Sequence, residues 1–233
     1  IKGDDQMLAV IVNTLAVFVG GMVGAGLSNR LAHKYQEAIM KFLPIAILVL
    51  GIDSALKGDI MIMIISIVGG VLVGEYLDLE GGLDKFADFL KKKFIKNSES
   101  DFSTGFISGV LLFCVGSMGI LGSIDAGVKG DYSILLTKAV LDGLSALFLA
   151  ASLGRGIAFA SLAVFIYEGA ICLLAGLLSP LFTDFVLANI SGVGGLTIIA
   201  IGLSMLDIVD FRIANALPAL AFPLIIGLIM SLI

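Results

Sequence analysis

The feature that most constrains this chain is a series of long apolar runs separated by short polar interruptions. Each run has about 20 residues, the length that an α-helix needs to cross the hydrocarbon core of a bilayer. Runs such as Ile60–Val73 do not alternate apolar and polar side chains, so barrel strands are not expected. The chain is therefore predicted to be an all-α, polytopic transmembrane helix bundle with about eight spans. The runs cover residues 8–27, 38–56, 60–77, 102–122, 132–153, 157–178, 185–206 and 214–233.

The composition supports a membrane environment. Of the 233 residues, 59% are hydrophobic and 14% are charged, and the mean hydropathy is +1.12. Soluble domains are about 45–50% apolar and about 25% charged. The net charge of −5 provides no basic surface for nucleic acid. The lipid bilayer is therefore expected to be the bulk partner of this chain, and nucleic acid is not.

The sequence contains no arrangement typical of an enzyme. It has no nucleotide-binding loop, no zinc-ligand spacing and no nucleophile near a histidine base. We therefore expect no catalytic residue and no cofactor, and the sequence assigns no metal ligands. Residues 1–6 precede a natural start at Met7 and are interpreted as an N-terminal extension or expression remnant. Residues 7–233 are predicted to form a single transmembrane domain.

The distribution of lysine and arginine predicts the orientation. Sorting these residues on alternate sides of eight spans leaves only Lys2, Lys57 and Lys129 on one side. Cytoplasmic loops carry the excess of positive charge, so both termini are predicted to lie outside. Apolar residues at helical spacing over residues 83–96 predict a cytoplasmic interfacial helix. The residues sorted to the cytoplasmic side are Arg30, Lys34, Lys41, Lys85, Lys91, Lys92, Lys93, Lys96, Arg155 and Arg212.

A weak internal repeat indicates transporter-like architecture. Sliding the sequence by 151 residues places Gly51 on Gly202, Asp59 on Asp210, and Pro44 on Gly195. The matched spans are first with sixth, second with seventh and third with eighth, and each pair runs in opposite directions in the predicted topology. This pattern predicts an inverted repeat of the form 3+2+3 with interrupted helices, as in many secondary transporters.

Polar side chains within the spans are the first candidates for a functional site. Asp142 and Glu168 lie near the centres of their runs, where a charge costs about 2.5–3.5 kcal/mol on the insertion scale. They are interpreted as a site for a cation, proton or small polar solute, or else as structural carboxylates. Lys138 is four residues before Asp142 and either pairs with it or extends to the outer interface. Asn13 either joins the site or forms an interhelical hydrogen bond.

Glycines in the spans suggest two roles. The small-residue spacing of closely packed membrane helices occurs at Gly20, Gly21 and Gly24, at Gly70 and Gly74, and at Gly105 and Gly109. Gly194 and Gly195, together with Gly192, disfavour a continuous helix by about 1 kcal/mol each relative to alanine. They predict a helix break whose free backbone groups bind a solute or ion.

Six segments of the chain carry a family resemblance, namely Val115–Ser123, Gly130–Leu135, Lys138–Gly143, Ser152–Gly156, Gly192–Leu196 and Asn215–Leu220. Together they resemble the bacterial DUF554 family. The resemblance implies an integral membrane protein of the bacterial inner membrane, described as a transporter or left uncharacterised. It also implies that Lys138, Asp142, Gly194, Gly195, Asn215 and Pro218 are site positions. At Glu168 the resemblance implies glutamine in relatives, which favours Asp142 as the shared ionisable group.

The leading hypothesis is a membrane transporter that moves an ion or small polar solute through a site at the membrane midplane. One alternative is an ion channel, whose flux would not saturate. A second alternative is a membrane scaffold whose interfacial helix recruits lipid or a partner. A small bundle of this kind is also compatible with a homodimer. The predicted site comprises Asn13, Lys138, Asp142, Glu168, Gly194, Gly195 and Asn215.

Overall fold

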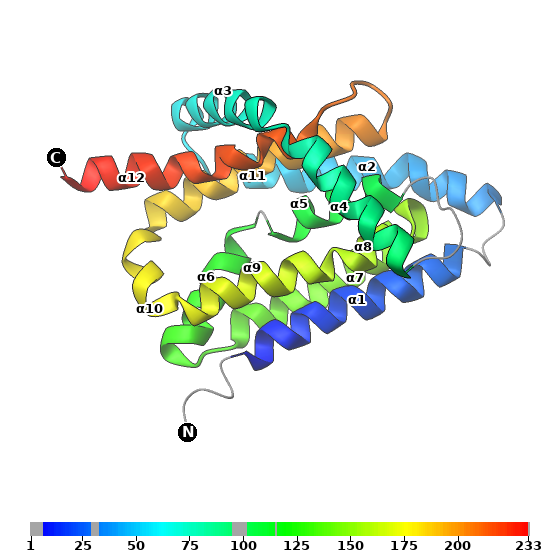
Figure 1. The fold of residues 1–233 in the computed structure, drawn as a ribbon, viewed down its shortest axis with the longest axis horizontal. Coiled ribbons are helices and arrows are strands. Elements are labelled where there is room, and N and C mark those ends of the chain that lie inside the picture. The colour runs from blue at the N-terminus through cyan, green and yellow to red at the C-terminus, as the bar shows by residue number, and fades with distance from the viewer. Residues whose placement is uncertain (1–6, 29–32, 95–101, 115, 233) are drawn as a thin grey trace. The chain divides into compact units, whose positions relative to one another are not determined.

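Every regular element that the structure describes is a helix. The computed structural model describes residues 7–28, 33–94, 102–114 and 116–232 (Figure 1). These residues divide into two compact units, here named unit 1 and unit 2, which are described separately. The helices are α1 (Leu8–Ser28), α2 (His33–Ala55), α3 (Ile60–Leu77), α4 (Leu79–Phe94), α5 (Phe102–Cys114), α6 (Ser117–Lys129), α7 (Ser133–Leu153), α8 (Gly156–Phe159), α9 (Ser161–Leu173), α10 (Ala175–Leu178), the 3₁₀ helix η1 (Ser179–Leu181), α11 (Asp184–Met205), the 3₁₀ helix η2 (Ile213–Ala221) and α12 (Phe222–Leu232).

Within the described residues, six segments are long and apolar enough to cross a membrane, or seven if one bent pair of helices is taken as a single span. The pair is α5 and α6, whose axes differ by 58°. The predicted run at 38–56 coincides with α2, whose side chains are described from Lys41 onward, a stretch shorter than a full span. The all-helical membrane fold is thus confirmed, and the eighth span stays a prediction. The six are Leu8–Leu27, Ile60–Leu77, Ser133–Leu153, Gly156–Leu173, Asp184–Met205 and Ile213–Met230.

In unit 1, α1 packs along α7 in the same direction and against α8 and α9 in the opposite direction (Figure 1). Two glycines permit the close approach of α1 and α7. A methyl group added at Gly20 would lie 2.2 Å from the Gly143 carbonyl oxygen, and one at Gly24 would lie 2.0 Å from that of Leu147. These helices pack backbone to backbone, as small residues allow in membranes.

In unit 2, α2 packs antiparallel to α11. A methyl group added at Gly195 would lie 2.6 Å from the Gly51 carbonyl oxygen, and one at Gly202 would lie 3.2 Å from the Pro44 carbonyl oxygen. The predicted break at Gly192, Gly194 and Gly195 is wrong, because α11 is continuous from Asp184 to Met205. The backbone groups of a buried membrane helix cannot form hydrogen bonds with water. The hydrogen bonds of a continuous α-helix therefore outweigh the low helix propensity of glycine.

The last span begins as a 3₁₀ helix instead of an α-helix. Segment η2 contains Pro218, which lacks an N–H donor and disfavours an α-helix through its position. This segment packs antiparallel to α3, with Ala219 against Gly70 and Asn215 against Gly74. A 3₁₀ stretch of nine residues is unusually long, since most such stretches have three or four.

The predicted interfacial helix corresponds to α4. Ala87 and Leu90 are buried, and the Phe86 ring lies 5.9 Å from the Phe106 ring in unit 1. Lys93 lies over the Phe89 ring at 5.6 Å. The helix therefore has one packed face and one polar face, as an amphipathic helix requires. The last two residues of the predicted range, 95 and 96, lie outside the described residues.

Candidate functional site

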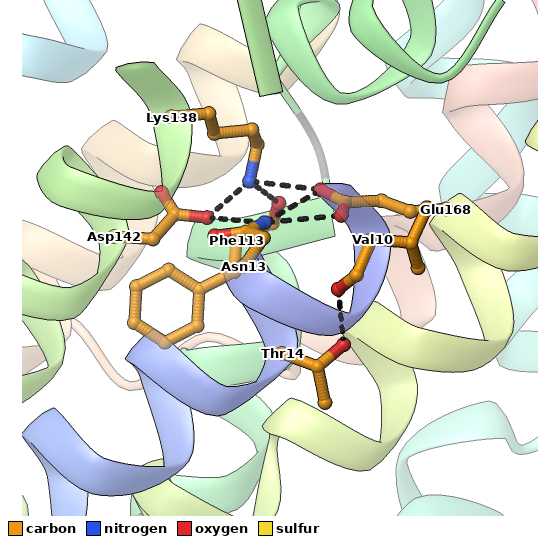
Figure 2. Close-up of polar contacts among 7 residues, drawn as sticks. All are labelled: Val10, Asn13, Thr14, Phe113, Lys138, Asp142 and Glu168. Atoms are coloured by element: carbon orange, nitrogen blue, oxygen red, sulfur yellow. Dashed lines mark hydrogen bonds and ion pairs between the residues drawn. The ribbon is translucent and has the colours of Figure 1, made fainter. Parts of the chain in front are cut away.

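Four polar side chains from three helices of unit 1 meet in one buried cluster, here named the charged cluster (Figure 2). It consists of Asn13 on α1, Lys138 and Asp142 on α7, and Glu168 on α9. Asn13 and Glu168 are 0% exposed. The parallel packing of α1 and α7, and the antiparallel packing of α9 against α1, place these residues at the same level.

Lys138 donates to three acceptors within the cluster. Its Nζ forms a hydrogen bond with the Phe113 carbonyl oxygen at 2.9 Å and an ion pair with Asp142. It also forms an ion pair with Glu168 Oε1 at 3.3 Å. The side chain is only 5% exposed, so Lys138 pairs with Asp142 and does not extend to the interface.

Asn13 joins the two carboxylates. Its Nδ2 donates to Glu168 Oε1 at 2.8 Å, to Glu168 Oε2 at 3.0 Å and to Asp142 Oδ2 at 3.3 Å. Its Oδ1 is buried and has no hydrogen-bond partner among the described residues. The neighbouring Thr14 hydroxyl donates to the Val10 carbonyl at 2.8 Å and therefore stays within its own helix (Figure 2). Asn13 is both an interhelical hydrogen-bond donor and a member of the cluster.

The carbonyl of Phe113 is available because α5 ends at Cys114. The last carbonyls of an α-helix have no partner inside the helix, and that end carries partial negative charge. The Lys138 ammonium occupies this position. Gly119, near the start of α6, lies against the same cluster, since a methyl group there would be 3.3 Å from Lys138 Cε and 3.5 Å from Glu168 Oε1.

This interruption between α5 and α6 was not predicted. The sequence signal was present in Gly116, Ser117 and Gly119, which lie within the apolar run at 102–122. Glycine and serine indicate a helix break less specifically than proline does. The break was instead predicted in α11, at Gly192, Gly194 and Gly195. No sequence signal identifies the Phe113 carbonyl as a partner of Lys138, because every residue has a backbone carbonyl.

Helix α7 has a defined start just outside the membrane segment. The backbone N–H of Ser133 donates to Asp131 Oδ1 at 3.0 Å, and the Ser133 hydroxyl donates to the same oxygen at 2.7 Å. The backbone bond is the largest cause that holds the pKa of Asp131 below its ordinary value, and the Ser133 hydroxyl and the charge of Lys129 lower it further. These bonds fix the first turn of α7, one turn before Lys138.

Three of the predicted site residues lie in unit 2 and do not join the charged cluster. Gly194 and Gly195 belong to the continuous helix α11, where the Thr197 hydroxyl donates to the Gly194 carbonyl at 2.7 Å. Asn215 donates through Nδ2 to Glu75 Oε1 at 2.8 Å. Its Oδ1 accepts from the backbone N–H of Glu80, also at 2.8 Å. Asn215 thus ties the start of η2 to the end of α3.

Charged residues surround this second junction. Arg212 forms ion pairs with Glu75 at 2.6 Å and with Asp78. These side chains are about half exposed. Within the described ranges, no group of three or more histidine, cysteine, aspartate or glutamate side chains is arranged to hold a metal ion.

Comparison with known proteins identifies relatives over almost the whole chain. The family described as "Protein of unknown function (DUF554)" matches residues 8–228. The "Uncharacterized membrane protein YdfK" of Bacillus subtilis is 34% identical over 223 residues, covering 93% of this chain and 94% of the relative. The "Uncharacterized protein YqgA" of Escherichia coli is 32% identical over 226 residues, covering 94% and 96%. No solved structure matches. The chain therefore belongs to the DUF554 family of membrane proteins.

Proposed function

We propose that this protein is a transporter that moves an ion or small polar solute through the charged cluster of unit 1. The observation that carries the proposal is the burial of Lys138, Asp142 and Glu168 together between membrane helices. Ionisable groups at membrane depth are costly, and they usually mark a pathway for an ion or solute. A purely structural bundle has no need of three such groups at one point.

The interruption between α5 and α6 supports this proposal. Transporters commonly bind their substrates where a membrane helix is broken, because the free ends offer backbone groups and partial charges. Here the end of α5 already supplies the Phe113 carbonyl to the cluster. Free backbone groups were predicted in α11. The end of α5 offers such a group instead, next to the ionisable side chains.

Helix pairing within each unit supports an inverted repeat. The matched spans pack antiparallel: α1 with α8 and α9, α2 with α11, and α3 with η2 and α12. Between α2 and α11, Gly51 contacts Gly195 and Pro44 contacts Gly202. A shift of 151 residues relates Gly51 to Gly202 and Pro44 to Gly195. The repeat therefore maps the Gly51–Gly195 contact onto the Gly202–Pro44 contact, and the reverse. Such exchange is expected of two halves related by an axis in the membrane plane.

We also propose that the protein lies in the bacterial inner membrane with both termini outside. Lys57 precedes the start of α3, and Asp210 lies near Arg212, which contacts Asp78 at the end of α3. Cysteines introduced at Lys57 and Asp210 should therefore label from opposite faces, with the cysteine at 210 cytoplasmic.

The labelling is measured with a membrane-impermeant maleimide on intact cells and on inverted vesicles, in a background where Cys114 and Cys172 are replaced by alanine. Cysteines placed at Leu56 and Asp59 serve as controls beside Lys57. Labelling of positions 57 and 210 from the same face would contradict the predicted topology and the antiparallel repeat together.

The transport function is tested by a ligand-stabilisation screen of the purified chain against ions and metabolites. A compound that binds only the folded state at about 100 times its Kd stabilises that state by about 2.7 kcal/mol. We expect such a compound to raise the Tm of the natural chain and not that of Asp142→Asn. The matched control is Asp53→Asn, because Asp53 forms the same i,i+4 pair with Lys57 but is exposed.

A compound that stabilises the natural chain is then added to proteoliposomes, where carrier flux should saturate with concentration. Stabilisation that survives Asp142→Asn would place the solute site outside the charged cluster. Flux that rises linearly without saturation would favour a channel.

A further inference from the structure

The formal charges of the charged cluster do not cancel. Lys138 contributes one positive charge, whereas Asp142 and Glu168 contribute two negative charges. The three N–H donors of the Lys138 ammonium have three acceptors, so the charged form of lysine is fully satisfied. Lys138 pairs with Asp142 in its own helix and with Glu168 across helices, so the two carboxylates share one cation and one negative charge stays uncompensated. Glu168 is the more enclosed of the two carboxylates.

Glu168 is enclosed on every side. It is 0% exposed, whereas the Asp142 side chain is 14% exposed. From α1 it faces the Asn13 amide, which does not titrate, and from α6 it faces Gly119. A single added positive charge would make the enclosed cluster neutral. The titratable groups that face Glu168 are Lys138 and Asp142 on α7, Cys114 on α5, and Tyr167 and Cys172 on α9.

The Asn13 amide can bond to Glu168 in either protonation state. In the structure Nδ2 donates to both oxygens of Glu168, which suits the ionised carboxylate, and Oδ1 stays without a partner. A protonated Glu168 would present an O–H donor. A half-turn of the amide exchanges its oxygen and nitrogen, so that Oδ1 accepts from this donor.

We propose that Glu168 binds the proton that this transporter carries across the membrane, an inference that rests on the transport function proposed above. On binding, one carboxylate oxygen of Glu168 takes a proton from water on one side. On release, the same O–H bond breaks and the proton passes to water on the other side. A metal cation fits less well, because Phe113, Asp142 and Glu168 already surround the Lys138 ammonium with oxygen atoms.

Infrared titration of the purified full chain tests proton binding directly, with the proton itself as the probe. On passing from alkaline to acidic buffer, the natural chain should gain a carbonyl band of a protonated carboxylic acid that Glu168→Gln lacks. Asp53→Asn removes an exposed carboxylate and should leave this band in place. An identical titration in the natural chain and in Glu168→Gln would overturn the proposal, whatever a solute assay reports.

A second measurement links the proton to the solute. For a compound that stabilises the natural chain, the gain in Tm should depend on pH, whereas any gain that Glu168→Gln still shows should not. If the gain in Tm follows sodium chloride at fixed pH, with choline chloride as control, the carried ion is a metal cation and the proton proposal fails while transport stands. If no compound stabilises the chain, the transport function fails, and the infrared band alone decides whether Glu168 binds a proton.

Discussion

Replacing Lys138 with methionine is expected to destabilise the folded protein more than replacing either acidic residue of the charged cluster. Methionine keeps most of the length of the side chain but leaves Asp142 and Glu168 buried without a cation. Removing one partner of a buried ion pair costs about 3–5 kcal/mol. That is a large share of the about 5–15 kcal/mol by which proteins are usually stable. By contrast, Asp142→Asn leaves Lys138 paired with Glu168 and should stay within about 1 kcal/mol of the natural chain.

The measurement is thermal unfolding in detergent over a series that changes the formal charge of the cluster. Lys138→Met with Asp142→Asn should recover part of the loss, and the further change Glu168→Gln should recover more. Lys57→Met is the control, since the exposed Lys57–Asp53 pair should contribute no more than about 1 kcal/mol. Equal losses from Lys138→Met and Lys57→Met would mean that the cluster is open to water.

Gly24→Ala is expected to damage the protein, whereas Gly26→Ala in the same helix is expected to stabilise it. The new methyl group at Gly24 would lie 2.0 Å from the Leu147 carbonyl oxygen, and backbone at this distance yields only if α1 moves away from α7. Overpacking of this kind costs about 1–3 kcal/mol or more. At Gly26 nothing lies within 4 Å, so alanine brings only its higher helix propensity, about 0.5–1 kcal/mol.

Thermal unfolding and the yield of monodisperse protein measure this pair of variants. Gly24→Ala should also weaken stabilisation by any ligand of the charged cluster, because separating α1 from α7 withdraws Asn13 from Asp142. A shared Tm for the two variants would show that α1 and α7 are not in close contact in the membrane.

The side chains of the cluster were predictable, but their grouping was only partly so. Asn13, Lys138, Asp142 and Glu168 stand out because polar groups in apolar runs are costly and rare. The pairing of Lys138 with Asp142 follows from helical periodicity, although an exposed lysine was an equal alternative. That Glu168 is a second partner of Lys138 depends on contacts between different helices, which one sequence does not contain.

The predicted helix break at Gly192, Gly194 and Gly195 failed for a different reason. In a membrane helix, glycine marks either a break or a close contact, and the two have the same local sequence. At Gly195 the contact with α2 determines which of the two roles applies. The Gly51 carbonyl of α2 occupies the space that a side chain at position 195 would fill. Asn215 was implicated by resemblance alone. Its contact with Glu75 joins residues 140 positions apart, and neither partner predicts the other.

The arrangement of the charged cluster has a consequence for how the protein is made. Helix α7 carries Lys138 and Asp142 four residues apart, so it enters the bilayer with a positive and a negative charge already paired. Helix α9 carries Glu168 with no counter-charge among its own residues, and a lone charge at that depth costs about 2.5–3.5 kcal/mol on the insertion scale. Its insertion is therefore favoured by the earlier presence of α1 and α7, which supply Asn13 and Lys138. Synthesis from the N-terminus delivers those helices first, so the order of the chain matches the order in which the charges need their partners.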